Sequence, residues 1–312
     1  MRPRLLYMGF GRIGCACLTE LIANDFDVVG VFCRATDRAE RADPTSVFGL
    51  AQKTGLHCFS AENPSDSSFL SEAKELAPDL LLSVQYDRIL RPPLLAIPRY
   101  GAYNLHFGPL PRLRGCFPTK WAIIENEPAG VAFHCIDPGI DSGDVVDREL
   151  VPLAVDETDE SLYHRLQDVG FDVFRRQLPW MKRLEPPARL PQDSAEASYH
   201  PKALPFGGIV DWHREAGWLE RFVRAYTFPP YPFAKTWLDG NEVQIPAPVA
   251  IGPSTDGAEP GQLSITGGRD IAVACGTGSL ILGRVHIGGE IEAANAALHK
   301  AAAAGRVLTT SA

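Results

Sequence analysis

The chain has 312 residues, of which 38 are acidic and 30 basic, giving a formal net charge of −8; 45% of the residues are hydrophobic and 22% charged. This length exceeds that of an ordinary single domain and predicts two units. The acidic balance argues against a nucleic-acid partner, because phosphates are neutralised by Lys and Arg. The apolar runs are strand-sized, and nothing near the N-terminus resembles a signal peptide, so we expect no membrane partner and a cytoplasmic location.

The first half of the chain alternates between strand-like and helix-like segments. Strands are expected at 5–8, 28–32, 79–84 and 102–105, and helices at 13–24, 46–54 and 68–76. This alternation predicts an α/β fold with a parallel, doubly wound, Rossmann-like sheet. Two further strands at 131–136 and 145–151 and one long helix at 158–184 follow, the helix interrupted by Pro179.

The segment 186–198 is rich in Pro, Ser, Ala and Asp and predicts a linker. We therefore expect a catalytic domain at 1–185 and a second domain at 199–312. The second domain has a helical pattern at 218–225, short strands at 236–245, 262–266, 271–274 and 280–287, and a helix at 292–304. Short strands with this spacing predict a small β-barrel of the OB-like kind.

Gly9, Gly11 and Gly14 follow the first strand and match the dinucleotide-binding fingerprint. That fingerprint also needs an acidic residue after the second strand, where this chain has Cys33 and Arg34. An NAD(P)-dependent oxidoreductase, with Arg34 on a 2′-phosphate, is thus one alternative. A second is that the glycines serve packing alone.

The cysteines and histidines are scattered. Seven cysteines lack paired spacing and a neighbouring histidine cluster. We expect reduced, mostly buried thiols and no metal site.

One pattern carries chemistry. Asn104 and His106 are two residues apart on an expected strand, so both side chains point to the same side of the sheet, near the carboxyl end where α/β sheets bind ligands. Acyl transfer to an amine needs a donor for the oxyanion, a group that takes the amine proton and a group that sets that group's pKa. Asn104, His106 and, from a glycine-flanked loop, Asp141 supply these three chemical types.

Each of these residues also has an ordinary structural interpretation. His106 could be a hydrogen-bonded structural histidine, Asn104 a turn or cap residue, and Asp141 the start of an Asx-turn. A non-catalytic binding module would follow from these interpretations. The other histidines, His134 among them, are interpreted as structural.

Several motifs together resemble a known enzyme family. The set comprises Asn104-x-His106, Leu110-Pro111-x-x-Arg114-Gly115, Asp137-x-Gly139-x-Asp141-x-Gly143, and, near the C-terminal half, Ile209-Val-Asp211-Trp212 and Pro229-Pro-Tyr-Pro232. It resembles the formyltransferases that use 10-formyltetrahydrofolate, several of which pair a Rossmann-like domain with a C-terminal barrel. The resemblance implies that Asn104, His106 and Asp141 are catalytic, and that the pterin is held by Arg88, Ile89, Leu90, Asp137, Pro138, Gly139 and Ile140.

Two positions depart from the family pattern. Gly108 stands where the family loop usually has a serine, which questions the contacts of that loop more than the chemistry. Cys116 stands where one group of sugar formyltransferases has an arginine, which questions that particular substrate.

The amine acceptor is expected to be a small molecule, and a nucleotide-linked amino sugar fits best. The segment 127–144 resembles amino-sugar formyltransferases, and Arg112, Arg148 and Trp121 could serve phosphates and a base. An amino acid such as hydroxyornithine and methionyl-tRNA are the alternatives. Methionyl-tRNA predicts basic segments, but 34–44 and the linker both contain several acids. The oligomeric state stays open, a homodimer included.

Overall fold

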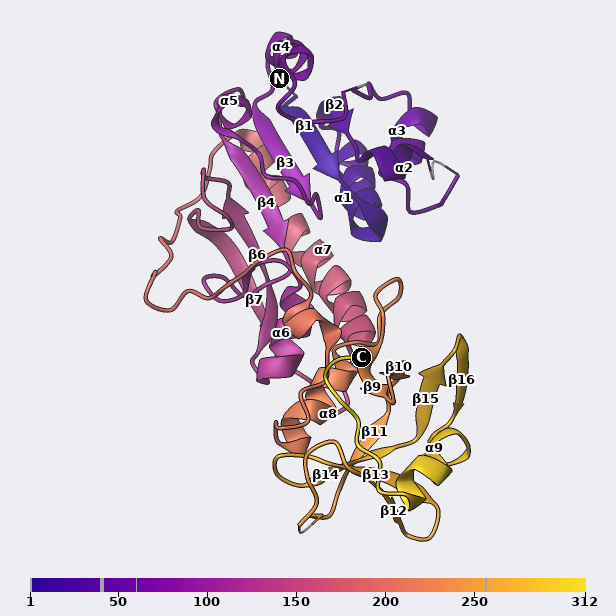
Figure 1. Ribbon diagram of the computed structural model, residues 1–312. Coiled ribbons are helices and arrows are strands. Elements are labelled where there is room, and N and C mark those ends of the chain that lie inside the picture. The colour runs from indigo at the N-terminus through magenta and orange to yellow at the C-terminus, as the bar shows by residue number, and fades with distance from the viewer. Residues whose placement is uncertain (1, 40–41, 60, 256) are drawn as a thin grey trace. The chain divides into compact units, whose positions relative to one another are not determined.

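The computed structural model describes residues 2–39, 42–59, 61–255 and 257–312. Two compact units divide the chain (Figure 1). The first unit contains Met1–Cys116, Ala129–Val151 and His164–Pro201. The second contains Phe117–Pro128, Pro152–Tyr163 and Lys202–Ala312, so two segments that precede residue 185 pack with the C-terminal part of the chain.

The first unit is built on a six-stranded sheet in the order β2-β1-β3-β4-β6-β7. These strands are β1 (Arg4–Gly9), β2 (Asp27–Phe32), β3 (Leu80–Val84), β4 (Ala102–His106), β6 (Ala129–Cys135) and β7 (Val145–Val151). The first four run parallel, whereas β6 and β7 join as an antiparallel edge. The fold is therefore mixed α/β with a Rossmann-like parallel sheet, as the sequence predicts.

The helices of this region lie near the positions that their patterns predict. They are α1 (Gly11–Ala23), α2 (Ala35–Ala39), α3 (Val47–Lys53), α4 (Ser67–Glu75), α5 (Pro92–Leu95) and α7 (Asp159–Arg183), the last containing Pro179. Helix α1 buries Ile13, Cys17, Leu18 and Leu21, which recur every three or four residues and so share one face. The short helices α2 and α5 were not expected from the sequence.

One side of the sheet packs on an aromatic core. Phe69 contacts both Phe32 and Phe59 edge-on, with the Phe32 and Phe69 ring centres 4.6 Å apart, and Phe32 and Phe59 are tilted against each other. This cluster also contains Leu90, and Tyr86 and Ile136 pack against it. The core thus includes one residue of segment 88–90 and ends, at Ile136, next to segment 137–140; the family resemblance assigns both segments to pterin binding.

The second unit contains two four-stranded antiparallel sheets, ordered β16-β15-β10-β9 and β11-β14-β13-β12. Their strands are β9 (Ala234–Leu238), β10 (Asn241–Ile245), β11 (Val249–Gly252), β12 (Leu263–Thr266), β13 (Asp270–Ala274), β14 (Ser279–Leu282), β15 (Arg284–Ile287) and β16 (Glu290–Ala293). Helices α6 (Pro118–Glu125), α8 (Ala216–Arg224), α9 (Ala294–Ala303) and a 3-10 turn, η1 (Pro205–Gly208), complete it. This small antiparallel β domain is the second fold element that the sequence predicts.

Two expected strands are each divided in the structure. The segment 236–245 forms the hairpin β9 and β10, and 280–287 forms β14 and β15. Asp239 and Gly240 both have positive φ and make the hairpin turn, a pairing that favours such turns. No described helix is long and apolar enough to cross a membrane.

Candidate active site

Strand β4 places Asn104 and His106 beside the antiparallel edge of the sheet. Asn104 pairs with Ser83 of β3 on one side and with His134 of β6 on the other. Its amide Nδ2 lies 3.1 Å from His134 Nε2. The His106 and His134 rings are 6.3 Å apart and nearly perpendicular, so the two side chains of β4 approach the same neighbour from β6.

Asp141 completes this cluster from the loop between β6 and β7. Its carboxylate lies between two imidazoles, with Oδ2 3.6 Å from His106 Nδ1 and Oδ1 3.5 Å from His134 Nε2. The backbone N–H of Gly115 donates a 2.8 Å hydrogen bond to Oδ2. The structure thus brings together all three residues for which the sequence predicts catalysis.

Carbonyl partners fix which imidazole nitrogens carry hydrogen. His106 Nε2 lies 2.9 Å from the Leu113 carbonyl oxygen, and His134 Nδ1 lies 2.8 Å from that of Cys135. A carbonyl accepts only, so both nitrogens donate. When His134 is neutral its Nε2 can accept from Asn104, and when His134 is protonated Nε2 can instead donate to Asp141 Oδ1. In neutral His106 it is Nδ1, facing Asp141, that can take a proton.

Electrostatics keep Asp141 ionised. Burial alone would raise the pKa of Asp141, but the charge of His106, the hydrogen bond and charge of His134, and the Gly115 N–H hold it well below its usual range. His106 is only 7% exposed. A carboxylate that stays charged stabilises an imidazolium that forms beside it.

Gly108 makes room for this arrangement. A Cβ at Gly108 would lie 2.5 Å from His106 Nε2 and 2.9 Å from the Leu113 carbonyl oxygen. Glycine at this position, where the family loop usually has a serine, therefore leaves the space in which His106 hydrogen-bonds to Leu113.

The residues with an expected pterin role lie on two segments that border one core. Leu90 is buried, whereas Ile89 is 54% and Ile140 38% exposed, and Arg88 is also exposed. The second segment is shaped by Asp137, whose Oδ1 accepts hydrogen bonds from Gly139 N and Ser142 Oγ. These contacts make the Asx-turn considered from the sequence, at Asp137 rather than Asp141; Pro138 lies within it.

Tyr86 adds a polar atom beside these segments. Its hydroxyl is buried without a hydrogen-bond partner among the described residues, and burial raises its pKa to about 12. The phenol is therefore neutral near pH 7. A buried hydroxyl without a protein partner, two residues before Arg88 in the chain, suits a ligand with polar edges.

The glycine-rich turn has a packing role in this structure. A Cβ at Gly9 would lie 2.5 Å from the Tyr7 ring, and one at Gly14 would lie 3.0 Å from Val47. The Arg34 guanidinium lies 3.9 Å from the centre of the Phe10 ring, and its Nε lies 3.0 Å from Asp87. These contacts support the interpretation that the glycines serve packing. They also engage Arg34, the residue considered for a 2′-phosphate.

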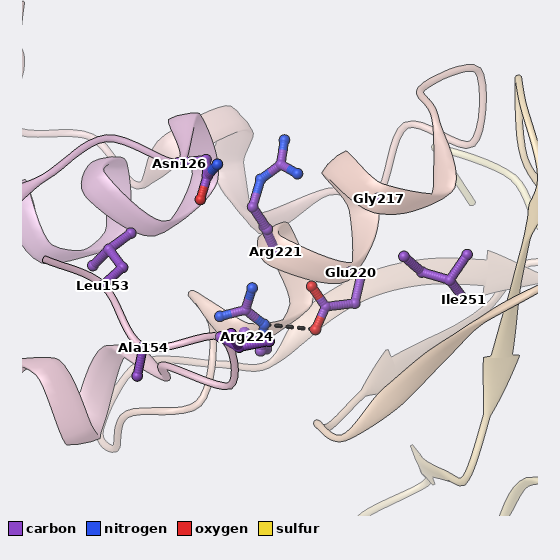
Figure 2. Close-up of a pocket in the computed structure, with 9 residues that line it drawn as sticks. Asn126, Leu153, Ala154, Gly217, Glu220, Arg221, Arg224 and Ile251 are labelled. Carbon is purple, nitrogen blue, oxygen red and sulfur yellow. Dashed lines mark hydrogen bonds and ion pairs between the residues drawn. The ribbon is translucent and has the colours of Figure 1, made fainter.

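A separate cavity lies within the second unit and has about 320 Å³ of volume. Figure 2 shows Arg224 beside Glu220, with 2.6 Å between Nε and Oε1, and Arg221 and Ile251 on its walls. Val155, also on the wall, is 97% exposed. None of the residues with a predicted catalytic or pterin-binding role lines this cavity. Within the described part of the chain, no group of three or more His, Cys, Asp or Glu is placed to hold a metal ion.

Comparison with family models decides the identity. Residues 5–178 match the model of the formyl transferase domain, and residues 207–301 match the formyl transferase C-terminal domain. The chain belongs to the formyl transferase family. It is a formyltransferase, which confirms the enzyme class and the family resemblance inferred from the sequence.

The relatives of this formyltransferase differ in acceptor. A methionyl-tRNA formyltransferase from Geobacter sulfurreducens is 31% identical over 290 residues, covering 92% of this chain and 90% of that enzyme. An N-formyltransferase from Helicobacter canadensis, solved with folinic acid and dTDP-3-aminofucose, has a TM-score of 0.71 at 20% identity, covering 90% of this chain and 99% of that one. The sugar 3N-formyltransferase WlaRD, solved with dTDP and 5-N-formyl-THF, has a TM-score of 0.67 at 17% identity, covering 90% and 98%. The structural likenesses show the shared fold.

Sequence reasoning missed two residues at this site. The sequence interpretation of His134 is structural, but His134 lies directly opposite Asn104 in the register of β4 and β6. Gln192 falls in the predicted linker, yet its side chain hydrogen-bonds Arg114 and two carbonyls of the Asp141 loop. No local pattern signals either residue, because both are placed by contacts between segments far apart in the sequence.

Proposed function

We propose that this formyltransferase moves the formyl group of 10-formyltetrahydrofolate onto the primary amine of a nucleotide-linked amino sugar. The observation that carries the chemistry is the cluster of Asn104, His106 and Asp141, in which an amide, an imidazole and a low-pKa carboxylate lie within hydrogen-bonding or ion-pairing reach of one another or of His134. The folate supplies the formyl group; the residues of the chain supply the environment in which it is transferred.

Each side chain has one task in this proposal. Asn104 uses its amide N–H to stabilise the negative charge that develops on the formyl oxygen. His106 takes the amine proton at Nδ1 as the new bond from the amine to the formyl carbon forms, and returns that proton to N10 of the folate as the bond from the formyl carbon to N10 breaks. Asp141, ionised beside His106, stabilises the imidazolium. His134 holds the Asn104 amide through Nε2 and so fixes its orientation.

The donor fits the segments 88–90 and 137–140. Arg88 and the backbone of Ile89 and Leu90, together with the turn of Asp137, Pro138, Gly139 and Ile140, hold the pterin in this proposal. Exposed Ile89 and Ile140 supply apolar surface, and the unpaired Tyr86 hydroxyl supplies a polar group.

The acceptor assignment rests on charge. The chain has a net charge of −8. Arg34 pairs with Asp87, Arg38 donates to the carbonyls of Phe59 and Ala61, and Arg114 donates to Gln192. These arginines lie in the two short arginine-containing segments 34–41 and 112–114, and all three are bound to groups of the protein; Arg41 lies outside the described residues. A small anionic acceptor is therefore favoured over a long phosphate backbone.

Residues with an expected acceptor role are distributed over both units. Arg148 donates a 2.7 Å hydrogen bond to the Leu110 carbonyl in the first unit, which also contains Arg112. Trp121 belongs to the second unit, where its ring contacts Phe206. Their contribution to a phosphate or base site stays part of the proposal, as do the cytoplasmic location and the homodimer.

Methionyl-tRNA is the second candidate acceptor, because a methionyl-tRNA formyltransferase is 31% identical over 92% of the chain. One panel separates the candidates. Single-turnover release of tetrahydrofolate is measured with dTDP-, UDP- and GDP-linked amino sugars, hydroxyornithine and methionyl-tRNA. We expect turnover with a nucleotide-linked amino sugar at physiological salt. Turnover with methionyl-tRNA alone would overturn the acceptor assignment, and none with any amine would overturn the proposed reaction.

A further inference from the structure

The segment that the sequence predicts as a linker is hydrogen-bonded along its length to the first unit. We call residues 190–200 the strap. Leu190 and Val145 exchange two 2.9 Å backbone hydrogen bonds. At the other end, β8 (Tyr199–His200) pairs in parallel with β5 (Arg114–Gly115). The strap thus joins two loops, 113–116 and 141–145, that are far apart in the sequence.

These two loops hold the catalytic pair. In loop 113–116, the Leu113 carbonyl accepts from His106 Nε2 and the Gly115 N–H donates to Asp141 Oδ2. Loop 141–145 carries Asp141 itself. The geometry between His106 and Asp141 therefore depends on the relative position of the two loops.

Gln192 bridges both loops with a single side chain. Its Nε2 donates to the carbonyls of Asp141 and Gly143 at 2.8 and 2.6 Å. Its Oε1 accepts from Nε and an Nη of Arg114 at 3.0 and 2.8 Å. The primary amide is suited to this task, because it offers two donors and an acceptor on one rigid plane.

Ser198 adds an independent contact to the same loop. Its Oγ accepts from Leu113 N at 2.8 Å, and its carbonyl accepts from Arg114 N at 3.0 Å. Leu113 has a φ of 60°, which lies in the left-handed region that leucine rarely adopts. Contacts with neighbouring residues are therefore needed to hold this conformation.

Both loops are closely packed at a glycine. A Cβ at Gly115 would lie 2.1 Å from the His200 carbonyl oxygen, and one at Gly143 would lie 2.0 Å from that of Cys135. Neither glycine has room for a side chain, so each loop lies directly against neighbouring backbone. We therefore expect a change in the strap to alter the position of Gly115, and with it the Asp141 carboxylate.

We propose that Gln192 is a positioning residue for formyl transfer, which fixes the catalytic pair of His106 and Asp141 by joining the two loops that carry their partners. The proposal rests on the catalytic roles given above. It predicts that Gln192 acts on the rate of transfer through Asp141, and not on donor or acceptor binding.

The principal variants are Gln192→Ala and Gln192→Glu. Glutamate keeps an acceptor for Arg114 but cannot donate to the Asp141 and Gly143 carbonyls. Both variants therefore lose the hydrogen bonds that connect the two loops. We expect kcat to fall by about tenfold to a hundredfold, the range for a misplacement of about 1 Å at a reacting group, with KM for 10-formyltetrahydrofolate changing by less than about threefold. Glu196→Ala, an exposed position in the same strap, is the matched control and keeps the wild-type kcat.

A double-mutant cycle with Asp141→Asn separates positioning from general structural support. It uses 10-formyltetrahydrofolate with dTDP-3-aminofucose, or with whichever panel amine is turned over. If Gln192 acts through Asp141, Gln192→Ala costs less than about twofold in the Asp141→Asn background. An equal cost in both backgrounds would overturn the positioning role, whereas an Asp141→Asn variant with undiminished kcat would instead overturn the proposed catalytic set.

Amide hydrogen exchange tests the same coupling without a substrate. Gln192→Ala and, as a second route in case the first variant does not fold, Ser198→Ala should speed exchange at Leu113 and Gly115 while leaving the amides of β1 and β3 unchanged. Unchanged protection at Leu113 and Gly115 in a folded variant would contradict the proposal, whatever the activity.

Discussion

Two carboxylates in this formyltransferase have opposite surroundings. Asp141, in the first unit, lies 3.5 to 3.6 Å from two imidazoles, and its side chain is 15% exposed. Asp159, in the second unit, lies 2.7 Å from Lys120 Nζ, and both side chains are at most 2% exposed. Asp141 thus faces two histidines and is partly accessible, whereas Asp159 faces a lysine and is fully buried.

The lysine is held from several sides. Its Nζ also donates to the Ala225 carbonyl at 2.8 Å and lies 4.9 Å from the ring centres of both Tyr226 and Tyr231. Burial lowers the pKa of Lys120, although Asp159 opposes this shift. Burial alone therefore does not separate the proposed catalytic carboxylate from the structural one: the type of partner and the exposure do.

The largest expected effect on activity comes from removing the imidazole beside Asp141. His106→Ala should lower kcat by about 10² to 10⁴-fold, because the proton acceptor is lost. The melting temperature should fall less than in Lys120→Ala, because Asp141 keeps His134 and the Gly115 N–H as partners. Steady-state kinetics and thermal unfolding measure both, with His299→Ala, an exposed histidine, as the control. A decrease of less than threefold would remove His106 from the catalytic set.

The corresponding change in the second unit should act on stability. Lys120→Ala leaves the Asp159 carboxylate buried and unpaired, and should lower the free energy of unfolding by about 3 to 5 kcal/mol. Urea denaturation measures this, and Lys53→Ala, at an exposed position, is the control. A free energy of unfolding close to that of the wild type would show that solvent reaches the Asp159 carboxylate. It would contradict the contrast drawn between the two sites.

A smaller effect is expected where the loop packs on His106. Gly108→Ala introduces a Cβ within 2.5 Å of His106 Nε2, so the ring must leave the Leu113 carbonyl. We expect kcat to fall by about tenfold. Gly217→Ala is the control, because the nearest atom to its new Cβ is 3.7 Å away. Unchanged kcat would mean that His106 works equally well without its bond to Leu113.

The smallest expected effect is on acid stability. The pKa of Asp141 is lower in the folded state than in the unfolded chain, so the ionised carboxylate contributes stability above about pH 4, and this contribution is lost as the pH falls below it. Asp141→Asn has no such contribution to lose. The difference in melting temperature between wild type and Asp141→Asn should therefore shrink as the pH falls below about 4; a constant difference would contradict the lowered pKa.

The sequence predicts the parts of the site that local patterns encode. Alternation on β4 places Asn104 and His106 together, and the glycine-flanked loop indicates Asp141. The expected strands 236–245 and 280–287 are each divided by a turn in the structure. The Asp239-Gly240 turn is predictable from the sequence, because this residue pair favours hairpin turns.

What the sequence could not predict depends on contacts between distant segments. The strap has the composition of a linker, yet Gln192 is hydrogen-bonded to residues about 50 and 78 positions away. His134 was left among the structural histidines because its significance comes from the β4 and β6 register, which is a property of the sheet. The local pattern of residue types encodes neither the distant contacts of Gln192 nor the register of β4 and β6.

The most direct test of the central claim separates chemistry from donor binding in Asn104→Ala. Calorimetry measures binding of 10-formyltetrahydrofolate, and rapid quench measures a single turnover with the accepted amine. We predict an unchanged Kd and a transfer rate lowered by about 10² to 10³-fold, because only the oxyanion donor is lost. An unchanged transfer rate at full donor occupancy would contradict the assignment of formyl transfer to the cluster of Asn104, His106 and Asp141.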